Sequence, residues 1–239
     1  MTALAQRLKN RFYRNEEHPY VLFEKAIEAV LEPNMTLLDA GCGRSAPILR
    51  KFKTTAGRLI GVDLVDPRDV EPGIEYHQAD LRSLPLQSAS VDIVISRSVF
   101  EHLTDPDAVY RELARVLKPG GKVIFLTANI WDYGTTIARL VPNRFHSKIV
   151  NYVEGRPEED TFPTAFKTNS KKAVERLSRS HGFSVADFTY LGQYPSYFMF
   201  NGFLFLLAVG YERLTRWGPL SFLRGWILVT LQKRHFAGS

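Results

Sequence analysis

The chain has 239 residues, of which 45% are hydrophobic and 12% aromatic, and this is enough to bury the core of one domain. The formal charge of +6 suits an anionic partner but is too small to identify one. A single cysteine, Cys42, excludes an internal disulfide and a cysteine-rich zinc site, so no metal is predicted. The first twenty residues lack the apolar core of a signal peptide, and we therefore expect a cytoplasmic protein.

From Thr36 onward, short β-rich runs alternate with helical patterns. In chain order, strands are predicted at 36–41, 58–63, 74–80, 91–96, 122–128, 183–191 and 225–234. Helices are predicted at 47–52, 105–118 and 169–182. In the second helix Asp105 is the expected N-cap, and Val109, Leu113, Val116 and Leu117 form one apolar face. This alternation is typical of an α/β protein with a mostly parallel sheet and helices on both faces.

Ligands of such sheets bind beyond the carboxyl ends of the strands, where this sequence places glycines and acids. Gly41 and Gly43 open the turn after the first strand, so backbone amides there can approach a ligand. Asp63 closes the second strand, about 20 residues beyond Gly43, as expected for an acid that binds a ribose. This spacing alone suits a nicotinamide dinucleotide equally well.

Three features favour S-adenosylmethionine over a dinucleotide. Ala46 stands where a dinucleotide turn has its third glycine. Asp39 precedes the turn, where its carboxylate would attract an ammonium group and repel a pyrophosphate. Asp80 supplies a further acid after the third strand.

The segments LLDAGCGRSA, GVDL, QADLRSLPLQSASVDIVIS, SVFEHLTDP and RELARVLKPGGKVIF resemble, in order and spacing, the class I S-adenosylmethionine-dependent methyltransferases of the type 11 group. The resemblance covers roughly residues 36–127. It implies a Rossmann-like sheet of seven strands, mostly parallel, with the last strand antiparallel. The family normally joins its sixth and seventh strands by a short connection, whereas here residues 193–224 intervene.

The resemblance also implies roles for individual residues. The glycine turn would hold the aminoacyl part of the cofactor, Asp63 the ribose, and Asp80 with the amide of Leu81 the adenine. The full predicted cofactor site consists of Asp39, Gly41, Cys42, Gly43, Asp63, Leu64, Asp80, Leu81 and Ser96.

His102 follows the fourth strand and is the candidate catalytic residue. If the acceptor is a hydroxyl, an imidazole near the methyl group would take its proton at neutral pH. The alternative is that His102 only packs or donates a hydrogen bond beside the cofactor. The neighbouring acid, Glu101, has no role assigned by the sequence.

We expect one methyltransferase domain spanning 1–239. Residues 1–35 would form an N-terminal helical cap and residues 36–128 the cofactor-binding core. Two insertions, 129–167 and 193–218, leave the carboxyl ends of strands five and six, which predicts that they form the acceptor pocket or its lid.

The segment 196–217 is apolar and ends with Arg213 and Arg216, as an interfacial helix does. It would meet a membrane surface at the inner face or line an apolar tunnel, and the alternatives are an ordinary buried helix or a homodimer contact. The leading acceptor is a small or lipid-like molecule, such as a glycolipid or lipid-linked saccharide, methylated at oxygen. The alternatives are a nucleic acid, which the lack of an RNA-binding module disfavours, and a noncatalytic S-adenosylmethionine-binding partner protein.

Overall fold

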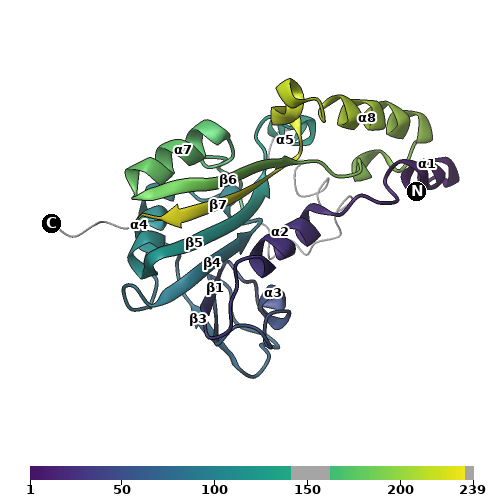
Figure 1. Cartoon of the computed structure of the whole chain (residues 1–239). Helices are drawn as coiled ribbons and strands as arrows, with labels where there is room; N and C mark the ends of the chain where they lie inside the picture. The colour runs from purple at the N-terminus through teal and green to yellow at the C-terminus, as the bar shows by residue number, and fades with distance from the viewer. Residues whose placement is uncertain (141–161, 235–239) are drawn as a thin grey trace. The chain divides into compact units, whose positions relative to one another are not determined.

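The computed structural model describes residues 1–140 and 162–234, which pack into two compact units (Figure 1). Unit 1 comprises Met1–Leu22, Ala128–Pro163 and Tyr190–Ile227, and unit 2 comprises Phe23–Thr127, Thr164–Thr189 and Leu228–Ser239. The expectation of one methyltransferase domain remains a prediction. Residues 141–161, the greater part of the first predicted insertion, lie outside the described residues.

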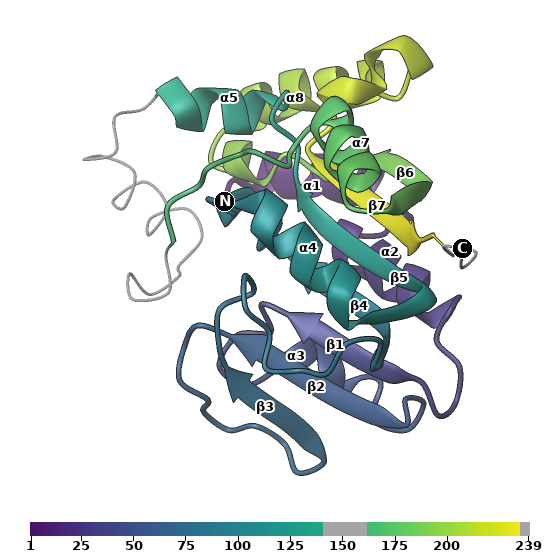
Figure 2. The same cartoon turned by 90° about the vertical axis from the view of Figure 1, so that its left-hand side faces the viewer.

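Seven strands form one sheet in the order β3-β2-β1-β4-β5-β7-β6 (Figures 1 and 2). Their bounds are β1 Thr36–Ala40, β2 Arg58–Asp63, β3 Ile74–Gln78, β4 Val91–Arg97, β5 Leu117–Ala128, β6 Phe183–Leu191 and β7 Trp226–Lys233. The first five strands pair in parallel. β7 is antiparallel to β6, since Arg234 donates to Gly182 while Gln232 accepts from Ser184. The predicted fold class and the antiparallel last strand are confirmed.

Helices cover both faces of this sheet (Figure 2). α4 (Pro106–Val116) and α7 (Lys171–Ser180) lie on one face, and α2 (Pro19–Glu28) and α3 (Pro47–Arg50) on the other. α4 begins as the sequence predicts, because the Asp105 side chain accepts from the amide of Ala108 at 3.1 Å. Its buried Tyr110 packs edge-on against Phe183 of β6.

The predicted end of α4 is wrong by two residues. Leu117 is buried as expected, but its ψ of 138° makes it the first residue of β5. The glycines explain the change: Gly120 has a φ of 78°, and a Cβ at Gly121 would sit 2.9 Å from the Asp92 carbonyl oxygen. The backbone therefore turns tightly at this point and continues directly into the strand.

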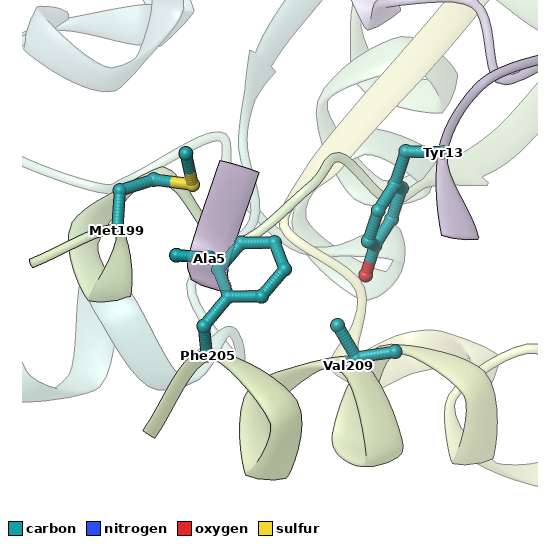
Figure 3. Close-up of a cluster of buried hydrophobic side chains, with 5 residues drawn as sticks. All are labelled: Ala5, Tyr13, Met199, Phe205 and Val209. Atoms are coloured by element: carbon teal, nitrogen blue, oxygen red, sulfur yellow. The ribbon is translucent and has the colours of Figure 1, made fainter. Parts of the chain in front are cut away.

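The described part of unit 1 is mainly helical outside the strand ends that it contains. Its elements are α1 Ala3–Phe12, α5 Tyr133–Leu140, the 3-10 turns η3 Ser196–Phe198 and η4 Gly218–Leu223, and α8 Gly202–Leu214. α1 and α8 pack together through Ala5, Tyr13, Met199, Phe205 and Val209 (Figure 3). Within the described residues, no helix combines the length and the apolar character needed to cross a membrane.

Candidate cofactor site

The predicted cofactor residues gather at one edge of the sheet in unit 2. Because β1, β2 and β3 are parallel, their carboxyl ends meet at this edge. Asp63, the last residue of β2, pairs with Gln78, the last residue of β3, and its carbonyl accepts from the Ala79 amide at 2.8 Å. Asp80 follows Ala79 directly. The two acids therefore lie on the same side of the fold, as a shared adenosine site requires.

Gly41 allows the turn after β1 to pass close to the loop after β4. Its φ is 86°, and a Cβ there would sit 2.3 Å from Cγ2 of Val99. A side chain at Gly43 would instead meet no atom within 4 Å. The amides of Gly41 and Gly43 both have acceptors within the chain, the Val62 carbonyl at 2.8 Å and the Asp63 carboxylate at 2.7 Å. The turn thus leaves open space in front of Gly43, while its own polar groups hold it in shape.

Asp63 connects the glycine turn to the loop after β2. Its Oδ2 accepts from the Gly43 amide at 2.7 Å, and its Oδ1 accepts from the Val65 amide at 3.2 Å. A carboxylate has about four acceptor positions, so two remain for other donors such as ribose hydroxyls. Leu64 lies between Asp63 and Val65 in the sequence, and 53% of its surface is exposed. It is therefore next to the carboxylate that is predicted to bind the ribose.

Asp39 in β1 is completely buried, and neither of its carboxylate oxygens has a hydrogen-bond partner. A buried charge without a partner is costly. Burial raises the pKa of Asp39 to about 7, opposed by the charge of Arg97 and assisted by that of Asp63. An ammonium group would supply the missing donors, and S-adenosylmethionine carries one on its aminoacyl tail. The residues present therefore fit this cofactor.

A pH dependence of cofactor affinity follows from Asp39. The ammonium favours the ionised carboxyl, so a pKa of about 7 predicts that affinity for S-adenosylhomocysteine falls about tenfold from pH 8 to pH 6. Because the folded pKa is raised, the ligand-free protein loses stability as pH rises from about 4 through about 7. Calorimetry with S-adenosylhomocysteine between pH 6 and pH 8 measures the change in affinity. In Asp39→Asn the affinity for S-adenosylhomocysteine should no longer depend on pH in this range. If the pH dependence persists in this variant, another group causes it.

Cys42 and Ser96 support the turn from inside. The Cys42 thiol is buried against Gly61 of β2, where a Cβ would sit 2.8 Å from the sulfur. Burial raises the pKa of this thiol, so it remains protonated at neutral pH. The Ser96 hydroxyl, also buried, donates to the Ala40 carbonyl at 2.6 Å and ties the end of β4 to that of β1.

Asp80 is held by Arg82, a residue that the sequence analysis did not select. The guanidinium donates through Nε and Nη2 at 2.7–3.1 Å, and the Arg82 amide donates at 2.8 Å. These hydrogen bonds lower the pKa of Asp80, which is therefore ionised at neutral pH. An adenine amino group would share this carboxylate with Arg82. Leu81 lies between Asp80 and Arg82 in the sequence and is buried. Its burial restrains the backbone amide that is predicted to bind the adenine.

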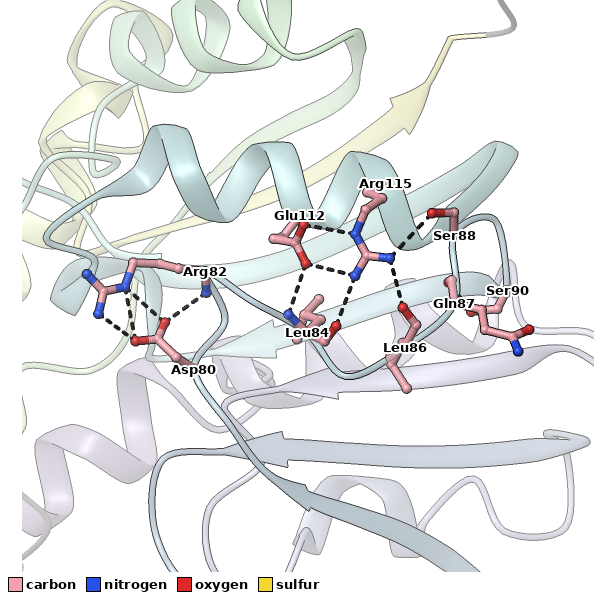
Figure 4. A network of polar contacts seen from close by, with 9 residues as sticks. All are labelled: Asp80, Arg82, Leu84, Leu86, Gln87, Ser88, Ser90, Glu112 and Arg115. Atoms are coloured by element: carbon pink, nitrogen blue, oxygen red, sulfur yellow. Dashed lines mark hydrogen bonds and ion pairs between the residues drawn. The ribbon is translucent and has the colours of Figure 1, made fainter.

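A second network holds the loop that carries Asp80 against α4 (Figure 4). The Glu112 carboxylate accepts from the Leu84 amide at 2.9 Å. Arg115 donates to the carbonyls of Leu84 at 2.9 Å and Leu86 at 2.8 Å, and it also binds Glu112. These contacts order the connection from β3 to β4.

His102 and Glu101 have different environments in the 3-10 turn η1 (Phe100–His102). The Glu101 carboxylate is buried and accepts from the Thr127 hydroxyl, which in turn accepts from Asn169 at 2.9 Å. His102 is half-buried, and its amide donates to Val99 at 2.9 Å. Glu101 therefore anchors the turn internally, whereas the His102 side chain remains the candidate for proton transfer. The sequence contains no local sign of the Glu101 network, because its members are far apart along the chain.

Unit 1 contains a buried polar cluster that the sequence analysis also missed. Burial raises the pKa of Asp132 to about 6, against the effect of backbone hydrogen bonds, and burial raises that of Glu212 to about 7, with a further contribution from the charge of Asp132. A Cβ at Gly192 would sit 2.6 Å from Oε2 of Glu212 and 3.1 Å from Nη2 of Arg224. Arg224 Nε is buried and has no hydrogen-bond partner. The one available signal was that Glu212 lies four residues after Ala208 and seven after Phe205, on the buried face of α8.

A sheet in this order, with a glycine turn after β1 and acids at the ends of β2 and β3, defines the class I fold of methyltransferases. Residues 38–125 match the family model described as a methyltransferase domain. This part of the chain is thus similar to the S-adenosylmethionine-dependent methyltransferases, enzymes whose cofactor is S-adenosylmethionine. Among the described residues, no three His, Cys, Asp or Glu side chains lie together in a way that could hold a metal ion.

Named proteins from other organisms are also similar in sequence to part of this chain. A Mycobacterium tuberculosis protein named a probable S-adenosylmethionine-dependent methyltransferase is 36% identical over 123 residues, which cover 48% of this chain and 43% of the relative. The malonyl-[acyl-carrier protein] O-methyltransferase of Hahella chejuensis is 35% identical over 101 residues, 38% of this chain and 36% of that enzyme. The chain thus spans less than half the length of these relatives.

Among solved structures, the methyltransferase in a complex with the activator Trm112 from Haloferax volcanii has a TM-score of 0.60 with this chain at 18% identity. The alignment covers 97% of this chain and 94% of that one. At this identity the likeness establishes the fold alone.

Proposed function

We propose that the protein transfers a methyl group from S-adenosylmethionine to an oxygen atom of a small or amphipathic acceptor. The observation that carries the proposal is the buried carboxylate of Asp39, whose two oxygens lack hydrogen-bond partners at the edge where Asp63 and Asp80 also lie. A dinucleotide would bring a negatively charged pyrophosphate to this turn, whereas the aminoacyl tail of S-adenosylmethionine brings an ammonium.

The cofactor supplies an electrophilic methyl group on a positively charged sulfur. In the proposal, Asp39 binds the ammonium, Asp63 accepts from the ribose hydroxyls, and Asp80 accepts from the adenine amino group beside the Leu81 amide. Gly41, Cys42, Gly43 and Ser96 shape the turn around the aminoacyl part, and Leu64 lies beside the ribose. His102 takes the proton of the acceptor hydroxyl as a general base.

We further propose that unit 1, which includes residues 129–140 and 162–163 of the first insertion and all of the second, binds the acceptor. Its exposed aromatic side chains, including Trp131 at 57% and Tyr197 at 43%, suit a sugar or an apolar chain. The half-buried Asp132 and Arg224 and the buried Glu212 supply polar groups of both signs. A glycolipid or lipid-linked saccharide, met at the inner face of the cytoplasmic membrane, combines both chemistries. Oxygen as the methylated atom is supported by relatives that are named O-methyltransferases.

The role of His102 is tested by His102→Ala. Loss of a general base lowers kcat by roughly 10²- to 10⁴-fold, with affinity for S-adenosylhomocysteine expected to change little, because the assigned cofactor contacts remain. Steady-state kinetics and calorimetry on the same preparations separate the two effects. An unchanged kcat would reduce His102 to a packing role.

The acceptor class is tested by mass spectrometry of lipids and glycans from a strain that lacks the gene, beside the same strain with the gene restored. The proposal expects a methyl group to disappear from one of these pools and to return on complementation. Restoration by an Asp63→Ala copy would indicate a noncatalytic partner protein. Unchanged lipids and glycans, with a methyl group missing from nucleic acid, would instead support the nucleic-acid alternative.

A further inference from the structure

The helix α8 is apolar on its exposed side as well as on its buried side. Phe205 and Val209 are buried against α1 (Figure 3), and Ala208 of α8 is buried as well. On the opposite side, Phe203 is 66% exposed and Leu207 57% exposed. A helix that is hydrophobic all round is normally buried, so this exposed side requires a covering partner.

We call the exposed side the α8 apolar face and define it as Phe203, Leu206, Leu207 and Leu214. Further exposed apolar residues stand beyond both ends of the helix, with Phe200 before it and Trp217 after it, each 64% exposed. α1 adds Leu4, which is 55% exposed and lies against Gly202, the first residue of α8. A Cβ at Gly202 would sit 2.6 Å from Leu4 Cδ2, so the two helices meet closely at this end.

The charges on these two helices are almost all positive. Residues 1–15 contain no Asp or Glu and carry four basic residues, Arg7, Lys9, Arg11 and Arg14. On α8 and the turn after it, the basic residues Arg213 and Arg216 are exposed, and the one acid, Glu212, is buried. Glu16 forms an ion pair with Arg216. The surface around the α8 apolar face therefore favours a negatively charged partner.

The apolar side chains and the charges together indicate which partner covers the α8 apolar face. A symmetric dimer through this face would bring the same basic residues of two copies toward one another, which is unfavourable. The helix has 13 residues, too few for the ~20 that a membrane span needs. An anionic bilayer surface accepts apolar side chains at the depth of the headgroups and attracts the surrounding cations.

We propose that unit 1 docks on anionic membrane surfaces, with α8 lying in the plane of the headgroups and the α8 apolar face inserted among the acyl chains. Arg7, Arg14 and Arg213 contact the lipid phosphates. This inference deepens the proposed function, on which it rests, by naming the surface from which an amphipathic acceptor reaches the enzyme. Docking itself involves unit 1 alone.

Vesicle flotation of the full chain tests the docking. Binding to phosphatidylcholine vesicles that contain phosphatidylglycerol should be at least roughly tenfold tighter than to phosphatidylcholine alone, and it should weaken with added salt. The double variant Phe203→Ser with Leu207→Ser should lose roughly tenfold or more in affinity, because its apolar side chains no longer insert. Arg7→Glu with Arg14→Glu should abolish the preference for the anionic lipid.

Matched controls are available for both changes. Lys172→Glu with Arg179→Glu makes the same charge change on the exposed side of α7 in unit 2, and Val21→Ser removes an exposed apolar side chain of unit 1 outside α1 and α8. Both controls should bind vesicles as the unaltered protein does. A control that loses as much binding as its matched variant would mean that charge or hydrophobicity in general, and not this face, governs the binding.

Two further measurements distinguish failure of the docking from failure of the proposed function. Calorimetry with S-adenosylhomocysteine needs no vesicles, so a chain that floats with anionic vesicles but does not bind this ligand would retain the docking and overturn the proposed function. Light scattering after size-exclusion chromatography reports the oligomeric state. If the protein does not bind vesicles but forms a dimer, and Phe203→Ser with Leu207→Ser dissociates that dimer, then a second copy covers the α8 apolar face and the docking is overturned. A monomer that ignores anionic vesicles would overturn it as well.

Discussion

Asp63→Ala is expected to weaken binding of S-adenosylhomocysteine by roughly 100-fold or more, close to 3 kcal/mol. The reason is that one carboxylate does two things. It accepts from the amides of Gly43 and Val65, at 2.7 and 3.2 Å, and so positions the glycine turn relative to the loop after β2. In the proposed function it also accepts from the ribose hydroxyls. Calorimetry measures the affinity, and circular dichroism verifies that the variant is folded.

Asp187→Ala provides the matched control, since Asp187 is an exposed acid of β6 in the same unit. Its affinity for S-adenosylhomocysteine should equal that of the unaltered chain. The affinity of Asp63→Asn for S-adenosylhomocysteine should lie between those of Asp63→Ala and Asp187→Ala. The amide retains one acceptor oxygen but presents an NH₂ group to one of the two backbone donors. A folded Asp63→Ala protein with full affinity would show that the acid after the second strand does not bind the ribose.

Gly41→Ala is expected to reduce the free energy of unfolding by about 3 kcal/mol, of which the left-handed backbone accounts for about 1–2 and overpacking for the rest. The φ of 86° disfavours any L side chain, and the new methyl group would sit 2.3 Å from Cγ2 of Val99. Valine has little rotamer freedom with which to move away. Urea denaturation followed by circular dichroism measures the loss.

The two contributions can be separated. Gly43→Ala has a similar backbone cost, with a φ of 68°, but no atom within 4 Å of the new methyl group, so about 1 kcal/mol is expected. Combining Gly41→Ala with Val99→Ala should show a favourable coupling of about 1–2 kcal/mol, because the second change removes the clash. Equal losses in Gly41→Ala and Gly43→Ala would mean that the close approach to Val99 has no energetic weight.

The fold could be predicted from the sequence because its elements are local. β2 and β6 begin and end where the patterns of RLIGVD and FSVADFTYL place them. The predicted cap at Asp105 likewise depends on a residue three positions away. The end of α4 was missed because helical periodicity continues through Leu117, while the glycine-dependent turn that follows it decides the backbone.

The candidate site was predictable only in outline. The strand-end acids Asp63 and Asp80 follow from the pattern of the strands, and their common edge follows from the parallel register. The clamp of Arg82 on Asp80 is a choice of side-chain rotamer that no sequence pattern encodes. The contact of Glu101 with Thr127 joins residues 26 positions apart. The burial of Glu212 was hidden because its apolar neighbours on α8 point both inward and outward.

The packing of Cys42 against Gly61 makes the one thiol of the chain a reporter of the cofactor turn. The sulfur is shielded, and burial raises its pKa, so alkylating and oxidising reagents should spare the folded protein. Labelling then proceeds only when the turn opens, and its rate measures how often that happens. A ligand that closes the turn should slow labelling in proportion to its occupancy, which gives a direct readout of the cofactor site without any knowledge of the acceptor.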